Sequence, residues 1–439
     1  MIRWLQFGIA SGFFFHTTAA TFTSLGVILP AMIEDRGWGY GEAFFGFSLF
    51  ALIVGLVSLA PAWALRRLGL KLVYVIGGGA LIAGFAWIAM GQSPYDFYGG
   101  LVLAGLGYTL CGPVGAIHLI NARFAEKRSG LIGFYMTIGG LGGVAGPQMA
   151  TWVTSLAGAW QAHWWVLIAV TFILTALALL FIDAPRRLPD SAGATQTGTA
   201  ASSENSEPAQ NPASGVGRVF ITDFDWAYGD VLKTPQFYVI VAAMTLTLLC
   251  GLTMNAAAPS HLLGLGVTQA IVATSLSTHA ILNALSRGLG GILSGRIDPK
   301  WLLVSALLAE VIGMAALADG SSFAMIALFV LGEGYGFGMC LFATTVLLVN
   351  YYGPDRNPEL LGTLNLISTI AMIGPVLAGT LAEQTGGFAS TFYGLAALMM
   401  VITVAALFMR PPQPAQSRRR IASPSEAGHI GVRVEQSDI

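Results

Sequence analysis

Long apolar segments dominate this chain and decide what it can fold into. A helix that crosses a lipid bilayer needs about 20 mostly apolar residues. Apolar residues make up 55% of the 439 positions and charged residues only 10%, which is too few charges to cover a soluble protein of this size. We therefore predict an all-α membrane protein with twelve transmembrane helices, at residues 9–32, 42–64, 72–90, 97–121, 130–153, 164–181, 237–259, 269–293, 302–318, 323–349, 360–382 and 391–409.

The Lys and Arg residues predict how these helices are oriented, because positive charges accumulate in loops on the cytoplasmic side of a membrane. With the N-terminus inside, 19 of the 21 Lys and Arg residues fall in cytoplasmic segments, and only Arg36 and Arg287 do not. We expect a multi-pass protein with both termini cytoplasmic. The net charge of -1 argues against a nucleic-acid-binding protein, which needs a basic surface.

A polar stretch in the middle divides the chain. Residues 189–217 are rich in Ser, Ala, Thr, Gln, Asn and Pro and contain no aromatic residue, a composition typical of disordered linkers. We expect four parts: an N-terminal six-helix bundle at 1–183, a disordered cytoplasmic linker at 184–219, an interfacial helix plus a C-terminal six-helix bundle at 220–410, and a disordered cytoplasmic tail at 411–439.

The two predicted bundles are related in sequence. An offset of 229 residues superposes Gly105 on Gly334 and Gly107 on Gly336, and further matches follow in the same order. We therefore expect the bundles to be pseudo-symmetric. Parallel repeats of six helices, with a binding site between them near the middle of the bilayer, are a common design of secondary transporters.

Several short motifs make the chain similar to one known family. The sequence DVLKTPQF at 230–237 resembles the start of span 7 in the monocarboxylate-transporter and oxalate/formate-antiporter branch of the major facilitator superfamily. The sequences GWGY at 37–40 and RFAEKRSG at 123–130 are similar to two loops of the same branch. The resemblance implies the major facilitator fold, a bacterial inner-membrane location and a small organic anion as substrate.

Two positions depart from the pattern of that family. The loop between spans 2 and 3 carries Arg66 where the superfamily usually has an acidic residue. In span 8 the branch has an Asp one turn before a substrate-binding Arg, whereas this chain has Asn283 one turn before Arg287. The residue that would titrate beside Arg287 is thus replaced, which leaves anion exchange and facilitated uniport open beside proton symport.

Arg287 lies inside a predicted span, where insertion of an arginine costs about 2.5–3.5 kcal/mol. Its guanidinium stays charged and offers a planar fork of donors that fits a carboxylate. His279, Asn283 and Arg287 follow each other at intervals of four residues, so they form one polar stripe along the helix. We expect this stripe to face the substrate cavity and Arg287 to bind the anion. The alternative is an arginine that extends to the cytoplasmic surface.

Glu333 is an acidic residue near the middle of a predicted span, among several glycines. Desolvation disfavours the charged form of a carboxyl group at that depth, which suits a residue that takes up and releases a proton. We expect Glu333 to serve proton coupling, with a residue that only fixes helix packing as the alternative. Glu310 is the weaker candidate, because its span is commonly peripheral in this fold and its sequence neighbours are apolar.

Three uncharged residues complete the predicted substrate site, namely Tyr108, Asn255 and Asn365. Each lies in a span that this fold turns toward its cavity, although hydrogen bonds between helices explain such residues equally well. His16 and His118 are isolated, and we expect them to serve packing.

These observations favour a secondary active transporter over an enzyme, because the sequence contains no nucleophile–base pair, metal cluster or cofactor loop. We predict neither a cofactor nor a metal. The expected function is alternating-access transport of a monocarboxylate, coupled to protons, by a monomer in the lipid bilayer. The alternatives are a drug or metabolite efflux transporter of the same superfamily and a nutrient sensor that does not transport.

Overall fold

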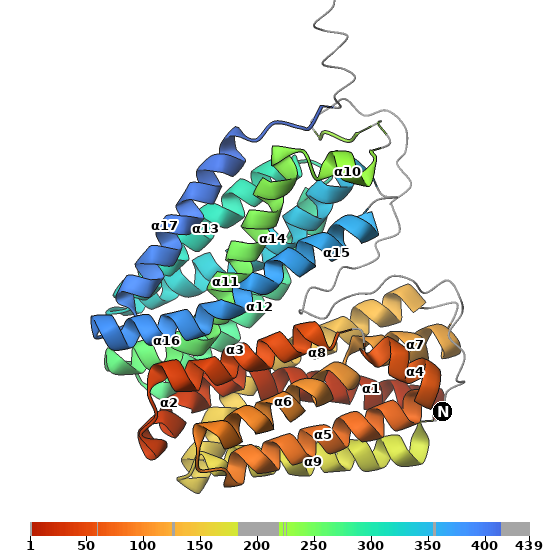
Figure 1. Ribbon diagram of the computed structural model, residues 1–439, viewed down its shortest axis with the longest axis vertical. Helices are drawn as coiled ribbons and strands as arrows, with labels where there is room; N and C mark the ends of the chain where they lie inside the picture. Colours follow the sequence, from red (N-terminus) through yellow and green to blue (C-terminus); the bar gives the residue numbers. More distant parts are fainter. Residues whose placement is uncertain are drawn as a thin grey trace, which may run out of the picture.

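The computed structural model describes residues 2–58, 60–124, 128–182, 219–222, 224, 226–353 and 357–413. All regular structure in these residues is helical, and it forms two bundles, drawn from red to yellow and from green to blue in Figure 1. Apart from residues 219 and 411–413, the predicted linker and tail lie outside the described residues.

The N-terminal bundle comprises α1 (Ile2–Thr18), the π-helical turn η1 (Ala19–Thr23), α2 (Ser24–Arg36), α3 (Tyr40–Leu56), α4 (Ala60–Leu68), α5 (Leu70–Met90), α6 (Pro94–Leu110), α7 (Pro113–Arg123), α8 (Arg128–Ala157) and α9 (Gln161–Phe181). The C-terminal bundle comprises α10 (Tyr228–Val231), α11 (Pro235–Gly264), α12 (Gln269–Leu293), α13 (Pro299–Asp319), α14 (Phe323–Tyr352), α15 (Asn357–Ser368), the 3-10 turn η3 (Thr369–Ile373), α16 (Gly374–Thr385) and α17 (Ala389–Phe408).

Most of these helices are suited to a bilayer. Within the described residues, nine continuous helical segments are long and apolar enough to cross a membrane, and the pair α3 and α4, bent by 54°, makes a tenth. The helices α8 and α12, of 30 and 25 residues, lie beside the others in their bundles, although glycines in α8 and polar residues in α12 make them less apolar (Figure 1). The prediction of an all-α membrane protein is confirmed.

The glycines that the sequence repeat aligned have the same packing role in both bundles. A Cβ atom at Gly107 of α6 would lie 2.6 Å from the Gly77 carbonyl oxygen of α5. A Cβ atom at Gly336 of α14 would lie 2.7 Å from the Ala306 carbonyl oxygen of α13. Both helix pairs therefore depend on the absence of a side chain at the equivalent position.

In the described part of the segment expected to form an interfacial helix at 220–235, the helical structure is the single turn α10. Trp226 and Val231 of this segment pack on the C-terminal bundle, whereas Ile221 and Phe224 are exposed. Trp226 is buried and its ring lies edge-on to that of Tyr352 at the end of α14, with 5.4 Å between ring centroids. Trp226 is thus held against the end of α14.

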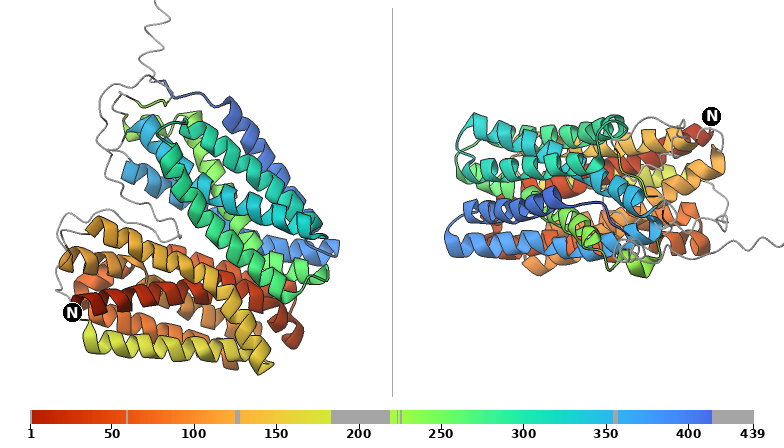
Figure 2. Two further views of the ribbon diagram at one scale, coloured as in Figure 1. Left: turned by 180° about the vertical axis from the view of Figure 1, so that it is seen from behind. Right: turned by 90° about the horizontal axis from the view of Figure 1, so that it is seen from above.

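The two bundles meet along α2, α3 and α8 on one side and α11, α12 and α16 on the other. The Gly41 N–H donates to the Glu383 carboxylate at 2.9 Å, and the Tyr40 ring lies edge-on to that of Phe388 with 5.0 Å between centroids. Figures 1 and 2 show the bundles in contact at the end that carries α2 and α16 and diverging toward α4, α7 and α15.

A break in the eleventh span supplies another contact between the bundles. The 3-10 turn η3 ends where α16 begins at Gly374 and Pro375. The first amides of a helix have no partner within that helix. The Val376 N–H donates instead to the Ser48 hydroxyl of α3 at 3.2 Å. An irregular backbone is thus tolerated here because the opposite bundle provides the acceptor.

The contact between α8 and α12 can be tested by cross-linking. A Cβ atom at Gly143 would lie 3.8 Å from that of Ala280, which is the mean separation in disulfides. We expect the double variant Gly143→Cys/Ala280→Cys to form a disulfide on oxidation. With a protease site inserted at 190–217, the two halves should stay joined after cleavage on a non-reducing gel and separate on a reducing one.

Either single cysteine variant serves as the control, since the native Cys111, Cys250 and Cys340 are buried and not disulfide-bonded. Separation of the halves of the oxidised double variant would mean that α8 and α12 do not face each other at this point.

Candidate functional site

Arg287 is held in a defined position on α12. Its Nε donates to Asn283 Oδ1 at 3.0 Å, one turn back along the helix. This hydrogen bond directs the guanidinium toward the beginning of α12 and away from its end at Leu293. An arginine that reaches for the nearer membrane surface would extend the other way. The Arg287 side chain is therefore hydrogen-bonded to a residue of its own helix.

The face of α12 that carries Arg287 is turned toward the N-terminal bundle. Ala280 and Arg287 are seven residues apart, two helical turns, so they lie on the same face. Ala280 is the residue that approaches Gly143 of α8. Arg287 is only half-buried. Arg287 lies two turns beyond the contact at Ala280, where the bundles begin to diverge. It is on the side of α12 that faces the opposite bundle.

Close packing against α14 fixes the backbone beneath this arginine. A Cβ atom at Gly334 would lie 2.8 Å from the Leu282 side chain. A Cβ atom at Gly338 would collide with the Asn283 carbonyl and the Ser286 hydroxyl. Small residues at helix contacts let backbones approach closely in a membrane. These two glycines therefore set the position of Asn283, and Asn283 in turn orients Arg287.

His279 lies one turn before Asn283 on α12. Its side chain is 5% exposed, and its ring lies edge-on to that of Phe337, with centroids 6.2 Å apart. Its Nε2 is buried and has no hydrogen-bond partner among the described residues. Buried polar atoms are normally paired, so Nε2 is a candidate contact for a ligand or an ordered water molecule.

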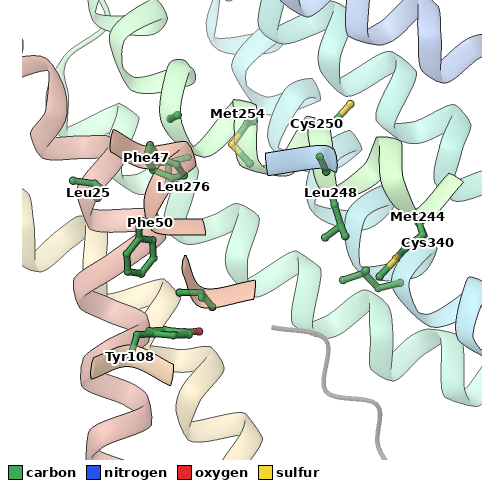
Figure 3. Close-up of a cluster of buried hydrophobic side chains, with 14 of the residues drawn as sticks. Leu25, Phe47, Phe50, Tyr108, Met244, Leu248, Cys250, Met254, Leu276 and Cys340 are labelled. Carbon is green, nitrogen blue, oxygen red and sulfur yellow. The ribbon is translucent and has the colours of Figure 1, made fainter. Parts of the chain in front are cut away.

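The remaining predicted substrate residues come from other helices. Tyr108 of α6 is buried in the N-terminal bundle, and its ring lies 5.9 Å from that of Phe50 (Figure 3). Asn255 of α11 donates to the Gly251 carbonyl at 2.7 Å, while its Oδ1 is buried without a partner in the described part of the chain. Asn365 is half-buried on α15. Only His279, Asn283 and Arg287 share one helix face.

Glu333 lies on a different face of α14 from the one that contacts α12. It is 0% exposed, and a Cβ atom at Gly313 of α13 would lie 2.7 Å from its backbone nitrogen. Glu310 of α13 lies against Gly336, one turn further along α14. Both carboxyl oxygens of Glu333 are without a hydrogen-bond partner among the described residues. Glu333 therefore faces the interior of the C-terminal bundle.

Glu310, whose sequence neighbours are apolar, has a polar neighbour on another helix. Glu310 is 0% exposed, and its Oε1 accepts a hydrogen bond from the Thr247 hydroxyl of α11 at 2.9 Å. Thr247 and Glu310 are 63 residues apart, so no local pattern could have paired them. The sequence offered one signal, namely that three predicted spans carry the polar residues Thr247, Glu310 and Glu333. Polar side chains inside a span tend to contact one another rather than lipid.

His163 of α9 is a second residue that sequence reasoning missed. It is 0% exposed, and neither ring nitrogen has a partner among the described residues. His16, treated as a packing residue, contacts the Thr171 hydroxyl through Nε2 at 2.8 Å. These polar groups lie within the N-terminal bundle, away from α12.

Two facing bundles of membrane-spanning helices, with an arginine on the side where they diverge, are the architecture of a membrane transporter. The chain belongs to the Major Facilitator Superfamily, whose sequence profile matches residues 9–277 and 242–433. This membership indicates a transporter rather than an enzyme.

One relative is the oxalate:formate antiporter of Oxalobacter formigenes, 24% identical over 277 residues, which are 61% of this chain and 60% of the antiporter. The match therefore spans less than two thirds of that protein. Similar solved structures include the nucleoside transporter NupG, with a TM-score of 0.65 and 16% identity over 93% of this chain and 98% of that chain. A bacterial homologue of the human lysosomal transporter Spinster, inward-facing and unoccupied, has a TM-score of 0.63 and 16% identity over 92% and 94%. At these identities the structures establish the fold alone.

The packing that positions Asn283 predicts the effect of a small substitution. Gly338→Ala should lower the stability of the purified protein by about 1–3 kcal/mol, because the new methyl group forces α14 away from α12. The matched control is Gly288→Ala on α12, where no atom lies within 4 Å of an added Cβ. Alanine favours a helix over glycine by about 1 kcal/mol, so the control should be neutral or stabilising.

Thermal unfolding in detergent measures both variants. An unchanged melting temperature for Gly338→Ala would mean that α12 and α14 are not in contact at Asn283.

Proposed function

We propose that this chain is a secondary active transporter of a small organic anion, specifically a monocarboxylate, and that Arg287 binds the carboxylate. The observation that carries the proposal is the hydrogen bond from Arg287 to Asn283, which directs the guanidinium back into the span on the side of the opposite bundle. The similarity to an oxalate:formate antiporter supports the same substrate class.

The proposed recognition depends on charge and shape together. Asn283 is uncharged, so it orients the guanidinium without neutralising it, and an anionic substrate supplies the negative charge. A guanidinium holds a carboxylate through two parallel hydrogen bonds, which fixes the direction of the substrate as well as its charge. His279, with its buried Nε2, is the proposed second contact on the same face.

Transport would follow from the two bundles rocking about this site. We propose that the protein lies in a bacterial inner membrane with both termini cytoplasmic, as the Lys and Arg residues indicate. The contacts of Gly41 with Glu383 and of Tyr40 with Phe388 would then close the outer side. In this orientation the described arrangement is open toward the cytoplasm, and a proton carried by Glu333 or by the substrate accompanies the anion.

Uptake into proteoliposomes tests the role of Arg287. With a panel of labelled monocarboxylates, Arg287→Ala should lose transport of the substrate that the wild type accumulates. A hydrogen bond to a charged group contributes about 1.5–3 kcal/mol. Arg287→Lys keeps the charge but loses the fork and the bond to Asn283, so its KM should rise roughly 10- to 100-fold.

The matched control is Arg296→Ala, which removes an exposed arginine nine residues further along the chain and should transport like the wild type. If the wild type neither takes up nor exchanges any monocarboxylate, or if Arg287→Ala transports as well as the wild type, the anion proposal fails. Efflux of neutral or cationic compounds would then be the better description.

A further inference from the structure

Two acidic residues lie on adjacent helices inside the C-terminal bundle, separate from the polar face of α12. Glu310 of α13 and Glu333 of α14 are both 0% exposed, and the Glu310 side chain lies against Gly336, one turn beyond Glu333 on α14. Only Glu310 Oε1 has a hydrogen-bond partner, the Thr247 hydroxyl at 2.9 Å. The other three carboxyl oxygens have none within the described residues.

Reciprocal glycines bring the backbones that carry the two acids together. A Cβ atom at Gly313 of α13 would lie 2.7 Å from the backbone nitrogen of Glu333. A Cβ atom at Gly336 of α14 would lie 3.0 Å from the backbone nitrogen of Glu310. Each acid therefore stands opposite a position on the other helix that has no side chain. The backbones of α13 and α14 can approach only because both positions are glycine.

Among the residues that the structure describes, no positive charge is paired with either carboxyl group. The titratable groups that interact with the pair are the thiols of Cys250 and Cys340. Other titratable residues lie elsewhere: His279 and Arg287 are on the α12 side of α14, and Tyr393 of α17 and Glu359 of α15 are exposed. His261 of α11 contacts the Leu317 carbonyl of α13, seven residues beyond Glu310, and the Tyr335 hydroxyl of α14 is hydrogen-bonded to that of Ser305 on α13.

Charge balance therefore requires a bound cation at this pair. Burying even one carboxylate without compensation costs several kcal/mol, and two adjacent carboxylates disfavour each other's charged form. A metal ion needs more ligands than are present, because no group of three or more His, Cys, Asp or Glu residues in the described part of the chain is placed to hold one. A proton needs only the two carboxyl groups.

We propose that Glu310 and Glu333 form one proton-binding site, in which the two carboxyl groups share a proton and Thr247 anchors Glu310. Binding converts one carboxylate and a proton from water into a carboxylic acid that donates to the other carboxylate, and release reverses this step. The Cys340 thiol, 3.1 Å from the Thr247 hydroxyl, is placed to donate to that hydroxyl while the hydroxyl donates to Glu310.

This site is linked to the anion site through α14. One face of α14 carries Glu333, and another face carries Gly334 and Gly338, which contact α12 at Leu282 and Asn283. Loss of the shared proton leaves two like charges between α13 and α14, which repel each other. If this repulsion displaces α14, it also moves Asn283, the residue that orients Arg287. This link rests on the proposed function, whereas proton binding by the pair does not.

Infrared difference spectra between acidic and alkaline pH test the site without any substrate. The carbonyl stretch of protonated carboxyl groups is compared for the wild type, Glu310→Gln, Glu333→Gln and the double variant in lipid nanodiscs. A shared proton predicts that the wild-type signal titrates in two coupled steps and is not the sum of the two single-variant signals. The double variant should lack the signal. Asp319→Asn, an exposed acid at the end of α13, is the matched control and should leave the two-step titration intact.

Other outcomes of this experiment would overturn the proposal. A wild-type signal equal to the sum of the single variants would mean two independent acids. A signal that disappears on adding sodium or potassium would mean that a metal cation occupies the site. Thr247→Val keeps the shape of the side chain and removes its donor, so it should change the frequency of the Glu310 signal. An unchanged frequency in a folded Thr247→Val protein would also count against the site.

Transport assays separate this proposal from the proposed function. Glu310→Gln and Glu333→Gln should both abolish accumulation driven by a proton gradient while they preserve exchange of labelled for unlabelled anion. If the wild type moves no carboxylate but the coupled titration is present, the proposed function fails and the proton site stands. If anions move and either Gln variant still accumulates them in a proton gradient, the link to transport is wrong.

Discussion

Close approach of helix backbones at glycines is the constraint on which the C-terminal bundle depends. Inside a bilayer, lipid is as apolar as a leucine side chain, so helices associate through tight packing and polar contacts. The helix α14 meets both requirements, because glycines on one face contact α12 and glycines on another contact α13. The position of Asn283 beneath Arg287 and the meeting of Glu310 with Glu333 both follow from this packing. A side chain added at Gly336 or Gly338 would disturb one of these arrangements.

The sequence was sufficient to predict the architecture because the bilayer restricts it so strongly. Spanning segments must be helical and about 20 residues long, so their order and approximate bounds are evident from hydropathy alone. The repeat that aligned Gly107 with Gly336 reflects equivalent helix contacts in the two bundles. The stripe of His279, Asn283 and Arg287 was also predictable, since residues four positions apart on a helix share a face wherever that helix lies.

What the sequence did not reveal is which polar residues of different helices meet. Thr247, Glu310 and Glu333 lie on three helices, and their contact depends on the rotation of each helix about its own axis. Hydropathy does not record that rotation in a bundle that is apolar on nearly all sides. For the same reason Glu310 looked isolated, although the structure places a donor against it. The packing of Trp226 on Tyr352 was likewise invisible, because alternating aromatic and acidic residues suit a membrane surface equally well.

In the C-terminal bundle, Arg287 is separated from the acids Glu310 and Glu333. In the proposed transporter this separation favours indirect coupling between proton binding and anion binding. If an acid stood beside Arg287, protonation and anion binding would compete for the same guanidinium. Here Asn283, to which Arg287 donates, is neutral, Glu333 lies on another face of α14, and Glu310 lies on α13. A proton bound between α13 and α14 can influence the anion only by changing the contact of α14 with α12. In such a link the packed helices have two alternative arrangements, and protonation of the acids favours one of them. A small change at the acids then produces a discrete change in the position of Asn283 and Arg287. The replacement of the expected acid by Asn283 is therefore compatible with proton coupling, provided that the protonated residues are Glu310 and Glu333.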